Sequence, residues 1–460
     1  MIKFFNTMSR KVEEFKPIHE EWVGIYSCGP TVYYYAHIGN LRAYVFADVL
    51  KRTLEYNNFK VKHVMNITDV GHLTSDNDVG EDKLEKAKEK ERKTAWEIAR
   101  FYEKAFFEDT AKLNIIRPDI TPRATEEIED QIKLIQKIEQ NGFAYIIEDG
   151  VYFDTSKLPD YGKLARLDIE NLKAGARVEM VEGKKNPTDF ALWKFSPKDK
   201  KRDMEWESPW GIGFPGWHIE CSEMSTKYLG IPFDIHTGGV DHIPVHHTNE
   251  IAQAEAAYGK EPVNYWMHNE FLIMKDEKMS KSKGDIITLQ KLIDKGYSPM
   301  DYRYLLLTAH YRKQLTFTWE ALDNAKKTMK KLERKVLEIK TEEKTQPNSK
   351  YKQKFLEAIN SDLNTSEALA VMWQMLKDEE ISNIEKYSTL LDFDKVLGLR
   401  LSEIKEEESS IPEEVKKLVE EREQARKEKN WSKADELRDK IKELGFRVVD
   451  TKEGAKIEKI

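Results

Sequence analysis

The stretch Cys28-Gly29-Pro30-Thr31-Val32-Tyr33-Tyr34-Tyr35-Ala36-His37-Ile38-Gly39-Asn40 joins a short apolar run to an amphipathic segment. Residues 24–28 favour a strand, and the Gly-Pro pair ends it. After the stretch, apolar positions recur at helical spacing, and Asn40 fits an N-cap. His37 is therefore expected just ahead of a helix N-terminus, where backbone N–H groups favour phosphate. Gly39 leaves room for a ring or phosphate to touch the backbone. A capped helix with an incidental histidine would explain the stretch equally well.

A second stretch, Lys278-Met279-Ser280-Lys281-Ser282, follows a predicted strand at residues 265–274. Alone it would be typical of a solvated, charged turn. Two lysines and two serines at this spacing also suit phosphate binding, and mobile cations stabilise the charge that develops on a leaving pyrophosphate. Together the two stretches predict a site that binds ATP and splits it between the α- and β-phosphates.

The pair resembles the two signatures of class I aminoacyl-tRNA synthetases, His-Ile-Gly-His and Lys-Met-Ser-Lys-Ser. The second matches without departure, and the first differs at its last place, where Asn40 stands. Asn40 can still donate a hydrogen bond to phosphate. The resemblance implies that His37 and Asn40 hold the phosphates, that Lys278 and Lys281 stabilise the transition state, and that Mg²⁺ accompanies ATP.

Length and composition agree with a large globular enzyme. The chain has 460 residues, of which 40% are apolar and 34% charged, so we expect two to four domains. No apolar run approaches the ~18 residues of a membrane span, and the first residues carry no signal-peptide core. We therefore expect a cytoplasmic protein, and a monomer, although the sequence does not fix the oligomeric state. With a net charge of −7, RNA binding would need a local basic face.

The chain has two cysteines, Cys28 and Cys221. A disulfide is not expected inside a cell, and two buried free thiols are one interpretation. However, His246 and Glu250 are four residues apart and share a face of a predicted helix. Two thiolates, an imidazole and a carboxylate form a tetrahedral zinc set. Spacing alone does not exclude His247 in place of His246.

These segments resemble the zinc-site segments of the cysteinyl-tRNA synthetase family, and the similarity covers nearly the whole chain. The resemblance implies one Zn²⁺ in the amino-acid pocket, held by Cys28, Cys221, His246 and Glu250, with His247 outside the set. In that family the metal takes the sulfur of the substrate. Zinc bonds a thiolate far better than a hydroxyl, whereas an apolar pocket gains only ~1–3 kcal/mol from a methylene-sized difference.

The implied function is that of a cysteine–tRNA ligase. ATP and cysteine would give cysteinyl-adenylate and pyrophosphate, and the acyl group would then pass to the terminal ribose of tRNA(Cys). Five further residues are expected at the site. Gly238 and Asp241 follow a predicted strand at residues 233–236, at the sheet edge where such folds bind ligands, and would reach the ribose or adenine. Trp217 would wall the pocket, and Thr31 and Thr68 would contact substrate.

The expected fold is α/β: a Rossmann-like nucleotide-binding catalytic domain with an insertion, an α-helical bundle and a small C-terminal domain. The predicted divisions are 1–115 for the first catalytic half, 116–205 for an insertion packed over the acceptor end of the tRNA, 206–310 for the second half with the Lys-Met-Ser-Lys-Ser loop, 311–405 for a tRNA-binding bundle and 406–460 for an anticodon-binding domain. The acidic segment 71–94 faintly resembles a calcium loop, but a solvated loop running into a helix is favoured, and its role stays open.

Two surfaces could meet RNA. Lysines on the helix expected around residues 322–339 form either a solvated face or a track for the tRNA backbone. In the tail, Arg426 and Trp431 suit unpaired bases. Two other functions remain open: a cysteine ligase of mycothiol synthesis, for which an anticodon domain has no use, and a non-catalytic zinc-stabilised RNA-binding protein, which would show no pyrophosphate exchange.

Overall fold

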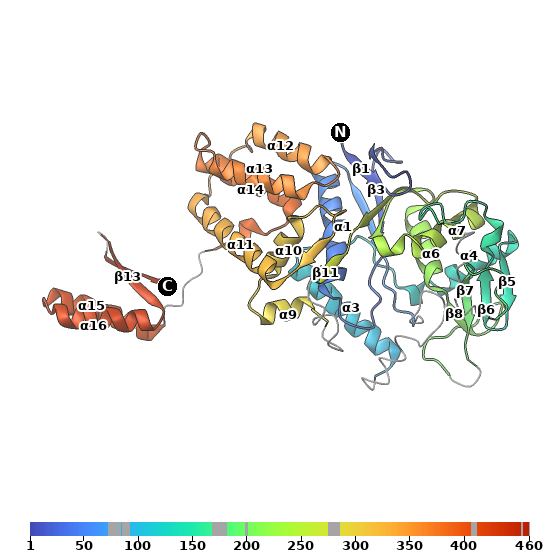
Figure 1. Ribbon diagram of the computed structural model, residues 1–460, viewed down its shortest axis with the longest axis horizontal. Coiled ribbons are helices and arrows are strands. Elements are labelled where there is room, and N and C mark those ends of the chain that lie inside the picture. Colours follow the sequence, from blue (N-terminus) through green and yellow to red (C-terminus); the bar gives the residue numbers. More distant parts are fainter. Residues whose placement is uncertain are drawn as a thin grey trace. The chain divides into compact units, whose positions relative to one another are not determined.

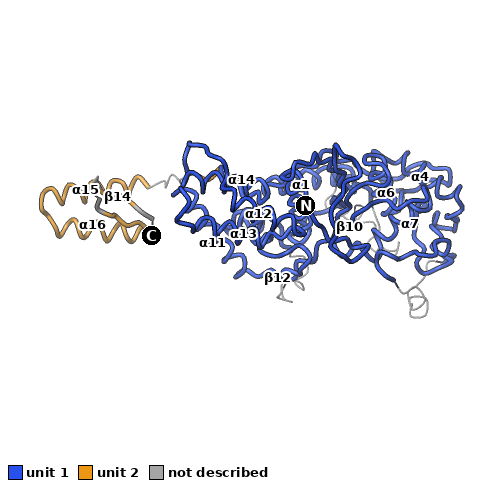
Figure 2. Tube along the Cα trace, turned by 90° about the horizontal axis from the view of Figure 1, so that it is seen from above, with its two compact units in different colours: residues 1–402 blue, residues 403–460 orange. Residues whose placement is uncertain are grey.

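The computed structural model describes residues 1–71, 84, 93–167, 182–197, 201–274, 286–405, 412–451 and 454–459. The chain forms two compact units, Met1–Ser402 and Glu403–Ile460 (Figure 2). The finer divisions expected inside the first unit stay predictions. Among the described residues, no helix is long and apolar enough to cross a membrane. Lys278 and Lys281 lie outside the described residues, as does nearly all of the acidic segment.

A four-stranded parallel sheet forms the centre of the first unit (Figure 1). Its order is β10 (Val263–Asn269), β9 (Phe233–Gly239), β3 (Val23–Ser27) and β4 (Val61–Met65). Every residue of β3 is buried, as expected for a parallel strand covered on both faces. The chain passes from β3 to β4 on one side, whereas β9 pairs on the other. The carboxyl ends of β3 and β9 therefore form a topological switch point, the usual ligand site of such sheets.

Helix α1 (Ile38–Tyr56) begins inside the stretch 28–40 that opens the sequence analysis. Its N-cap is His37, not Asn40, and this corrects the sequence-based prediction. His37 Nδ1 accepts a hydrogen bond from the Asn40 backbone at 3.2 Å, while the His37 backbone donates to Asn40 Oδ1 at 3.2 Å. This reciprocal pair satisfies two N–H groups that a helix start leaves unpaired, which explains why α1 starts one turn earlier than expected.

A second sheet belongs to the inserted segment. Its antiparallel order is β5 (Ala144–Ile147), β6 (Gly150–Phe153), β7 (Phe190–Phe195) and β8 (Gly213–Pro215), and it packs beside α4 (Ile128–Gln140). The last strand comes from residues that the sequence assigned to the second catalytic half. Gly216 then leads directly into α6 (Trp217–Leu229), so the insertion positions one helix of the switch point.

The remaining elements of the first unit follow in chain order. They are β1 (Lys3–Asn6), β2 (Lys11–Glu14), α3 (Ala95–Lys112), α7 (His246–Tyr258), β11 (Leu272–Met274), α9 (Leu289–Asp294), α10 (Pro299–Leu307), β12 (Leu315–Phe317), α11 (Trp319–Ile339), α12 (Ser349–Asn360), α13 (Thr365–Lys377) and α14 (Asn383–Leu397). Short 3₁₀ turns lie at residues 124–126, 155–157, 240–242 and 401–403. The apolar stripe predicted on α11 is buried throughout.

A buried arginine ties α1 and α3 to the helices that follow the parallel sheet in the chain. Arg303 on α10 is fully buried and bonds Asp48 Oδ2 on α1 at 2.5 Å. The same guanidinium donates to the Leu397 carbonyl at the end of α14 at 2.7 Å and to the Leu113 carbonyl after α3 at 3.0 Å. One side chain therefore joins four helices through charge-assisted hydrogen bonds.

The second unit contains α15 (Glu413–Lys427), α16 (Trp431–Glu443) and a hairpin of β13 (Phe446–Thr451) with β14 (Gly454–Lys459). Its core consists of Val415, Val419, Ile441 and Phe446. The four core residues belong to three elements, so the helices and the hairpin fold as one small body.

Candidate metal and nucleotide site

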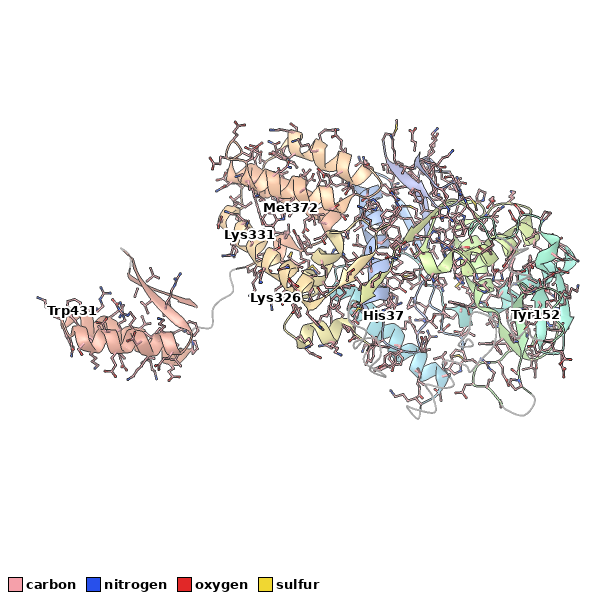
Figure 3. All side chains as sticks on the ribbon, viewed as in Figure 1. His37, Tyr152, Lys326, Lys331, Met372 and Trp431 are labelled. Atoms are coloured by element: carbon pink, nitrogen blue, oxygen red, sulfur yellow. The ribbon has the colours of Figure 1, made fainter. Side chains whose placement is uncertain are left out.

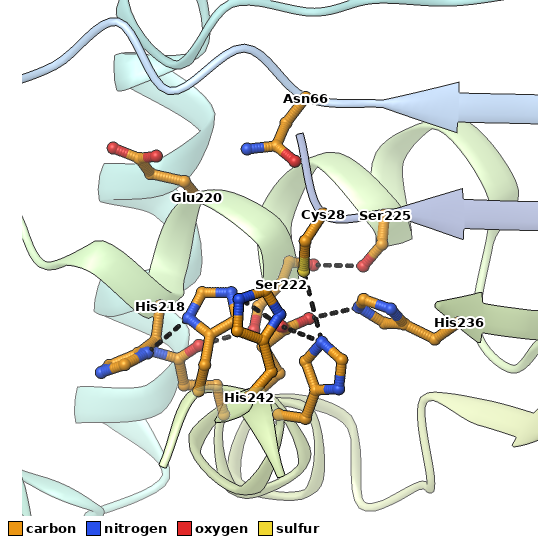
Figure 4. Close-up of polar contacts among 12 residues, drawn as sticks. Cys28, Asn66, His218, Glu220, Ser222, Ser225, His236 and His242 are labelled. Carbon is orange, nitrogen blue, oxygen red and sulfur yellow. Dashed lines mark hydrogen bonds and ion pairs between the residues drawn. The ribbon is translucent and has the colours of Figure 1, made fainter. Parts of the chain in front are cut away.

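The four expected metal ligands meet at the switch point. Cys28 follows β3, Cys221 lies on α6, and His246 and Glu250 lie on the first turns of α7. One ligand atom from each lies within 4.8 Å of the other three. Three of these side chains are buried and Cys28 is half-buried. Figure 4 shows Cys28 at the end of its strand, facing the histidines of the site.

The donor set fits a divalent metal of the zinc type. Glu250 Oε1 is buried and makes no hydrogen bond with a described residue, although His246 Nε2 lies 3.1 Å away, within ion-pair distance. An unsatisfied buried carboxylate oxygen is costly, and a cation among these atoms would satisfy it. Burial raises the pKa of the Cys28 thiol well above its ordinary value, and Cys221 and Glu250 raise it further. A bound divalent cation reverses that preference, because a coordinating thiol loses its proton.

His247 lies as close to the cluster as His246. Its Nε2 is 3.3 Å from Cys28 Sγ, and Cys28, His236, His247 and Glu250 form a second group within 4.8 Å. The His247 Nδ1 lies 2.7 Å from His268 Nε2. Burial lowers the pKa of His247 well below its ordinary value, and neighbouring histidines lower it further. The geometry brings both candidate imidazoles to the cluster. Position alone therefore does not choose between His246 and His247 as the metal ligand.

Further histidines surround the expected ligands and were missed by sequence reasoning. His218 Nδ1 lies 2.9 Å from His246 Nδ1, and His236 Nε2 lies 2.9 Å from Glu250 Oε2. His268 lies next to the last residue of β10, and His236 lies at the middle of β9. Their place on the strands that lead to the switch point was the available signal. Partners of this kind fix the orientation and tautomer of a ligand set.

Trp217, Thr31 and Thr68 also lie at this edge. The Trp217 ring centroid is 4.9 Å from that of His246. Thr31 and Thr68 form a parallel bridge, and Thr68 Oγ1 donates to Glu220 Oε2 at 3.1 Å. The structure therefore gathers all three expected substrate contacts around the cluster or the adjoining loop.

The segment that holds Gly238 and Asp241 differs from its prediction. Strand β9 continues to Gly239 instead of ending at residue 236, because residues 237–239 pair with the end of β10. A Cβ on Gly238 would lie 2.6 Å from the His247 ring and 2.7 Å from the His242 ring. Gly238 therefore makes room for histidines beside the metal cluster. The Asp241 side chain is largely exposed, with a carboxylate oxygen 3.9 Å from His242 Nε2.

The segment His37–Asn40, called the nucleotide motif below, lies at the start of α1. Contacts at this helix start reach both flanks of the stretch Lys278–Ser282. The Ile38 backbone donates to the Ile287 carbonyl at 2.9 Å, and His37 pairs with Thr288. On the other flank, the Arg42 guanidinium donates to the Phe271 carbonyl. The space at Gly39 is used by the His37 ring, because a Cβ there would lie 2.9 Å from His37 Nδ1. The two stretches that the sequence paired are thus neighbours through their described flanks.

Comparison with known proteins agrees with this geometry. Residues 14–327 match the family model described as tRNA synthetases class I (C) catalytic domain, and residues 408–456 match the Cysteinyl-tRNA ligase anticodon binding domain. The chain is 49% identical to a cysteine–tRNA ligase of Treponema denticola over 98% of both chains. It is 51% identical to cysteine–tRNA ligase 1 of Burkholderia lata, over 99% of this chain and 96% of that one.

Solved structures support the fold. Methionyl-tRNA synthetase of Mycobacterium tuberculosis, bound by methionyl-adenylate, aligns with a TM-score of 0.55 at 14% identity, over 82% of this chain and 90% of that one. The predicted α/β class with a parallel nucleotide-binding sheet is confirmed. From its catalytic and anticodon family models and its full-length relatives, the chain belongs to the class I cysteine–tRNA ligase family.

Proposed function

We propose that this class I synthetase activates cysteine with ATP, passes it to tRNA(Cys), and selects cysteine by a zinc–thiolate contact. The observation that carries the zinc proposal is the group of two sulfurs, one imidazole and one carboxylate within 4.8 Å at the switch point. The expected monomeric state and cytoplasmic location stay predictions.

The ligands in this proposal are Cys28, Cys221, His246 and Glu250. A zinc ion held by these four side chains would take the substrate sulfur as a fifth ligand, by expanding its coordination. Trp217, packed against His246, would close one wall of the pocket and limit its size. Thr31 and Thr68 would face the rest of the amino acid from the adjoining loop. Serine has a similar size, but its hydroxyl is a poor zinc ligand. The zinc contact would therefore separate cysteine from serine by the chemistry of the ligand atom and not by shape.

The phosphates of ATP would be held at the start of α1. Desolvation lowers the pKa of His37, which favours the neutral ring. Because Nδ1 accepts the Asn40 N–H, the ring proton lies on Nε2, which can donate to a phosphate oxygen. The Asn40 amide nitrogen is a second donor. Lys278 and Lys281 would stabilise the pyrophosphate charge, Gly238 and Asp241 would lie towards the ribose, and Mg²⁺ would accompany ATP.

Two surfaces would serve the tRNA. Trp431 in the second unit is 60% exposed (Figure 3), and Arg426 lies on the neighbouring helix of the same unit. On α11, Lys326 donates to the Gly296 carbonyl at 2.7 Å, and Lys331 lies over the Trp373 ring. We propose unpaired anticodon bases for the first surface and the backbone of the stem for the second.

The test is cysteine-dependent ATP–pyrophosphate exchange with and without tRNA, together with tRNA charging and zinc analysis of one preparation. We expect exchange with cysteine and none with serine, one zinc per chain, and charging of tRNA(Cys). Exchange without charging would favour the small-molecule ligase, although the match to an anticodon-binding domain speaks against that function. Absence of exchange would refute the proposal.

A further inference from the structure

A group of aromatic rings is exposed between the nucleotide motif and α3. Tyr34 and Tyr35 precede His37 and are 38% and 40% exposed, and Phe101 on α3 is 44% exposed. Tyr102 is 4% exposed and lies among them. We refer to Tyr34, Tyr35 and Phe101, supported by Tyr102, as the aromatic platform. Three adjacent exposed rings are unusual on a surface without a partner.

The rings of the aromatic platform pack against one another at steep angles. The Tyr35 centroid lies 5.0 Å from that of Tyr102 at 89°, 5.7 Å from that of Tyr34 at 79°, and 6.1 Å from that of Phe101 at 75°. These pairs meet edge to face, an arrangement that holds each ring firmly. The buried Tyr102 anchors the group, so the exposed rings are fixed before any ligand arrives, which reduces the entropic cost of binding.

A cavity of about 630 Å³ lies beside the platform, between α3 and α9. Tyr35 and Phe101 line one side, and Thr288, Gln290 and Lys291 line the other. Thr288 pairs with the backbone of His37. The cavity therefore lies beside the strand-like pairing of the residue that we propose to hold the ATP phosphates, and its volume lies in the range of small-ligand sites.

The charges on the rim are balanced. Lys112 lies 3.3 Å from Asp109, and Lys104 lies 3.9 Å from Glu108. Such paired charges give little net attraction for a phosphate chain. Lys93 Nζ lies 4.7 Å from the centroid of the Phe101 ring, and a base that stacks on this ring would displace it. The binding capacity of the platform therefore comes from its ring faces, which suit flat, uncharged groups.

We propose that the aromatic platform stacks unpaired nucleotides at the 3′ end of the tRNA as its terminal ribose approaches the adenylate. The inference rests on the proposed function, which requires that ribose to reach the region of His37. Unpaired bases expose faces that stack on aromatic side chains irrespective of sequence. A strand entering along α3 would pass Phe101 and then Tyr35 before it reaches the nucleotide motif.

The test compares Phe101→Leu and Tyr35→Leu with the ring-preserving controls Phe101→Tyr and Tyr35→Phe. Two RNA ligands are used, intact tRNA and the same tRNA shortened by its unpaired 3′ nucleotides. We expect each leucine variant to bind intact tRNA about 5- to 150-fold more weakly, the range for one stacked base. The controls should bind like the parent, and shortened tRNA should bind parent and variants equally.

Salt dependence and exchange complete the experiment. The slope of affinity against salt should be the same for parent and leucine variants, because stacking releases no counterions. Cysteine-dependent pyrophosphate exchange should be unchanged in all variants. Equal losses on intact and shortened tRNA, a changed salt slope, lost exchange in the leucine variants, or unchanged binding would each overturn the inference. Absence of exchange in the parent would instead refute the proposed function.

Discussion

Replacing Ile441 by alanine should separate the two half-reactions. Ile441 is fully buried in the core of the second unit, with Val415, Val419 and Phe446. Truncating a buried isoleucine to alanine costs about 2–5 kcal/mol. A unit of roughly 60 residues has a free energy of unfolding of about 3–9 kcal/mol, taking 0.05–0.15 kcal/mol per residue. One substitution should therefore remove a large part of the stability of this unit while leaving the first unit intact.

The assay measures exchange, charging and proteolysis on one preparation. Pyrophosphate exchange should match the parent, because all proposed ATP and cysteine contacts lie in the first unit. Charging should weaken through tRNA affinity, and proteases should cut within α15 and α16 much faster than in the parent. The matched control is Leu444→Ala, since Leu444 is 43% exposed and such substitutions usually change stability by less than about 0.5 kcal/mol.

Two results would refute this reasoning. If the variant is cut rapidly within the second unit and still charges tRNA like the parent, that unit has no part in tRNA binding. If exchange falls together with charging, the second unit supports the catalytic fold and the two half-reactions are not separable in this way.

Three further substitutions test the loop, a buried carboxyl and the arginine between the helices. Lys281→Ala should slow single-turnover adenylate formation by orders of magnitude and leave cysteine affinity unchanged. The reason is that a cation acting in the transition state affects the rate more than ground-state binding. An unchanged rate would exclude a role of Lys281 in stabilising the transition state. Burial, with Glu127 nearby, raises the pKa of Glu223 from 4.5 to about 8, so the folded state binds a proton more tightly than the unfolded one. This group should make stability fall as pH rises from about 4.5 to about 8, and the Tm of Glu223→Gln should vary less across that window than the Tm of the parent; parallel curves would contradict this. Arg303→Met should reduce the free energy of unfolding, measured in urea, by about 3 kcal/mol. This is the low end of the cost of breaking a buried pair, since Asp48 keeps a 2.8 Å hydrogen bond from Arg52. A loss under about 1 kcal/mol would show that the contact is not stabilising.

The sequence predicted those features that depend on local periodicity. The apolar stripe of α11 follows from helical spacing, and its residues are buried as expected. The shared face of His246 and Glu250 follows from a separation of one helical turn, and their side chains lie 3.1 Å apart. The start of α1 was placed late because histidine is an uncommon N-cap, and only the reciprocal bonds with Asn40 show how it serves as one.

Features that depend on strand register were beyond local patterns. His236 and His268 join the cluster because β9 and β10 are parallel neighbours, with His268 opposite Gly238. Strand β8 joins the inserted sheet because Trp193 pairs with Pro215 across a long separation in sequence. The aromatic platform forms because α3 brings Phe101 to within 6.1 Å of Tyr35. These contacts are set by tertiary packing, which no short window of sequence contains.

The most direct test of zinc-based selection measures metal content and cysteine-dependent exchange together, in the parent and in Cys221→Ser. We predict one zinc per chain in the parent, loss of exchange when a chelator removes it, and recovery when zinc is restored. Cys221→Ser should lose far more affinity for cysteine than for ATP, because a hydroxyl replaces one thiolate ligand. A metal-free parent with full cysteine-dependent exchange, and equal exchange with serine, would contradict the zinc–thiolate mechanism.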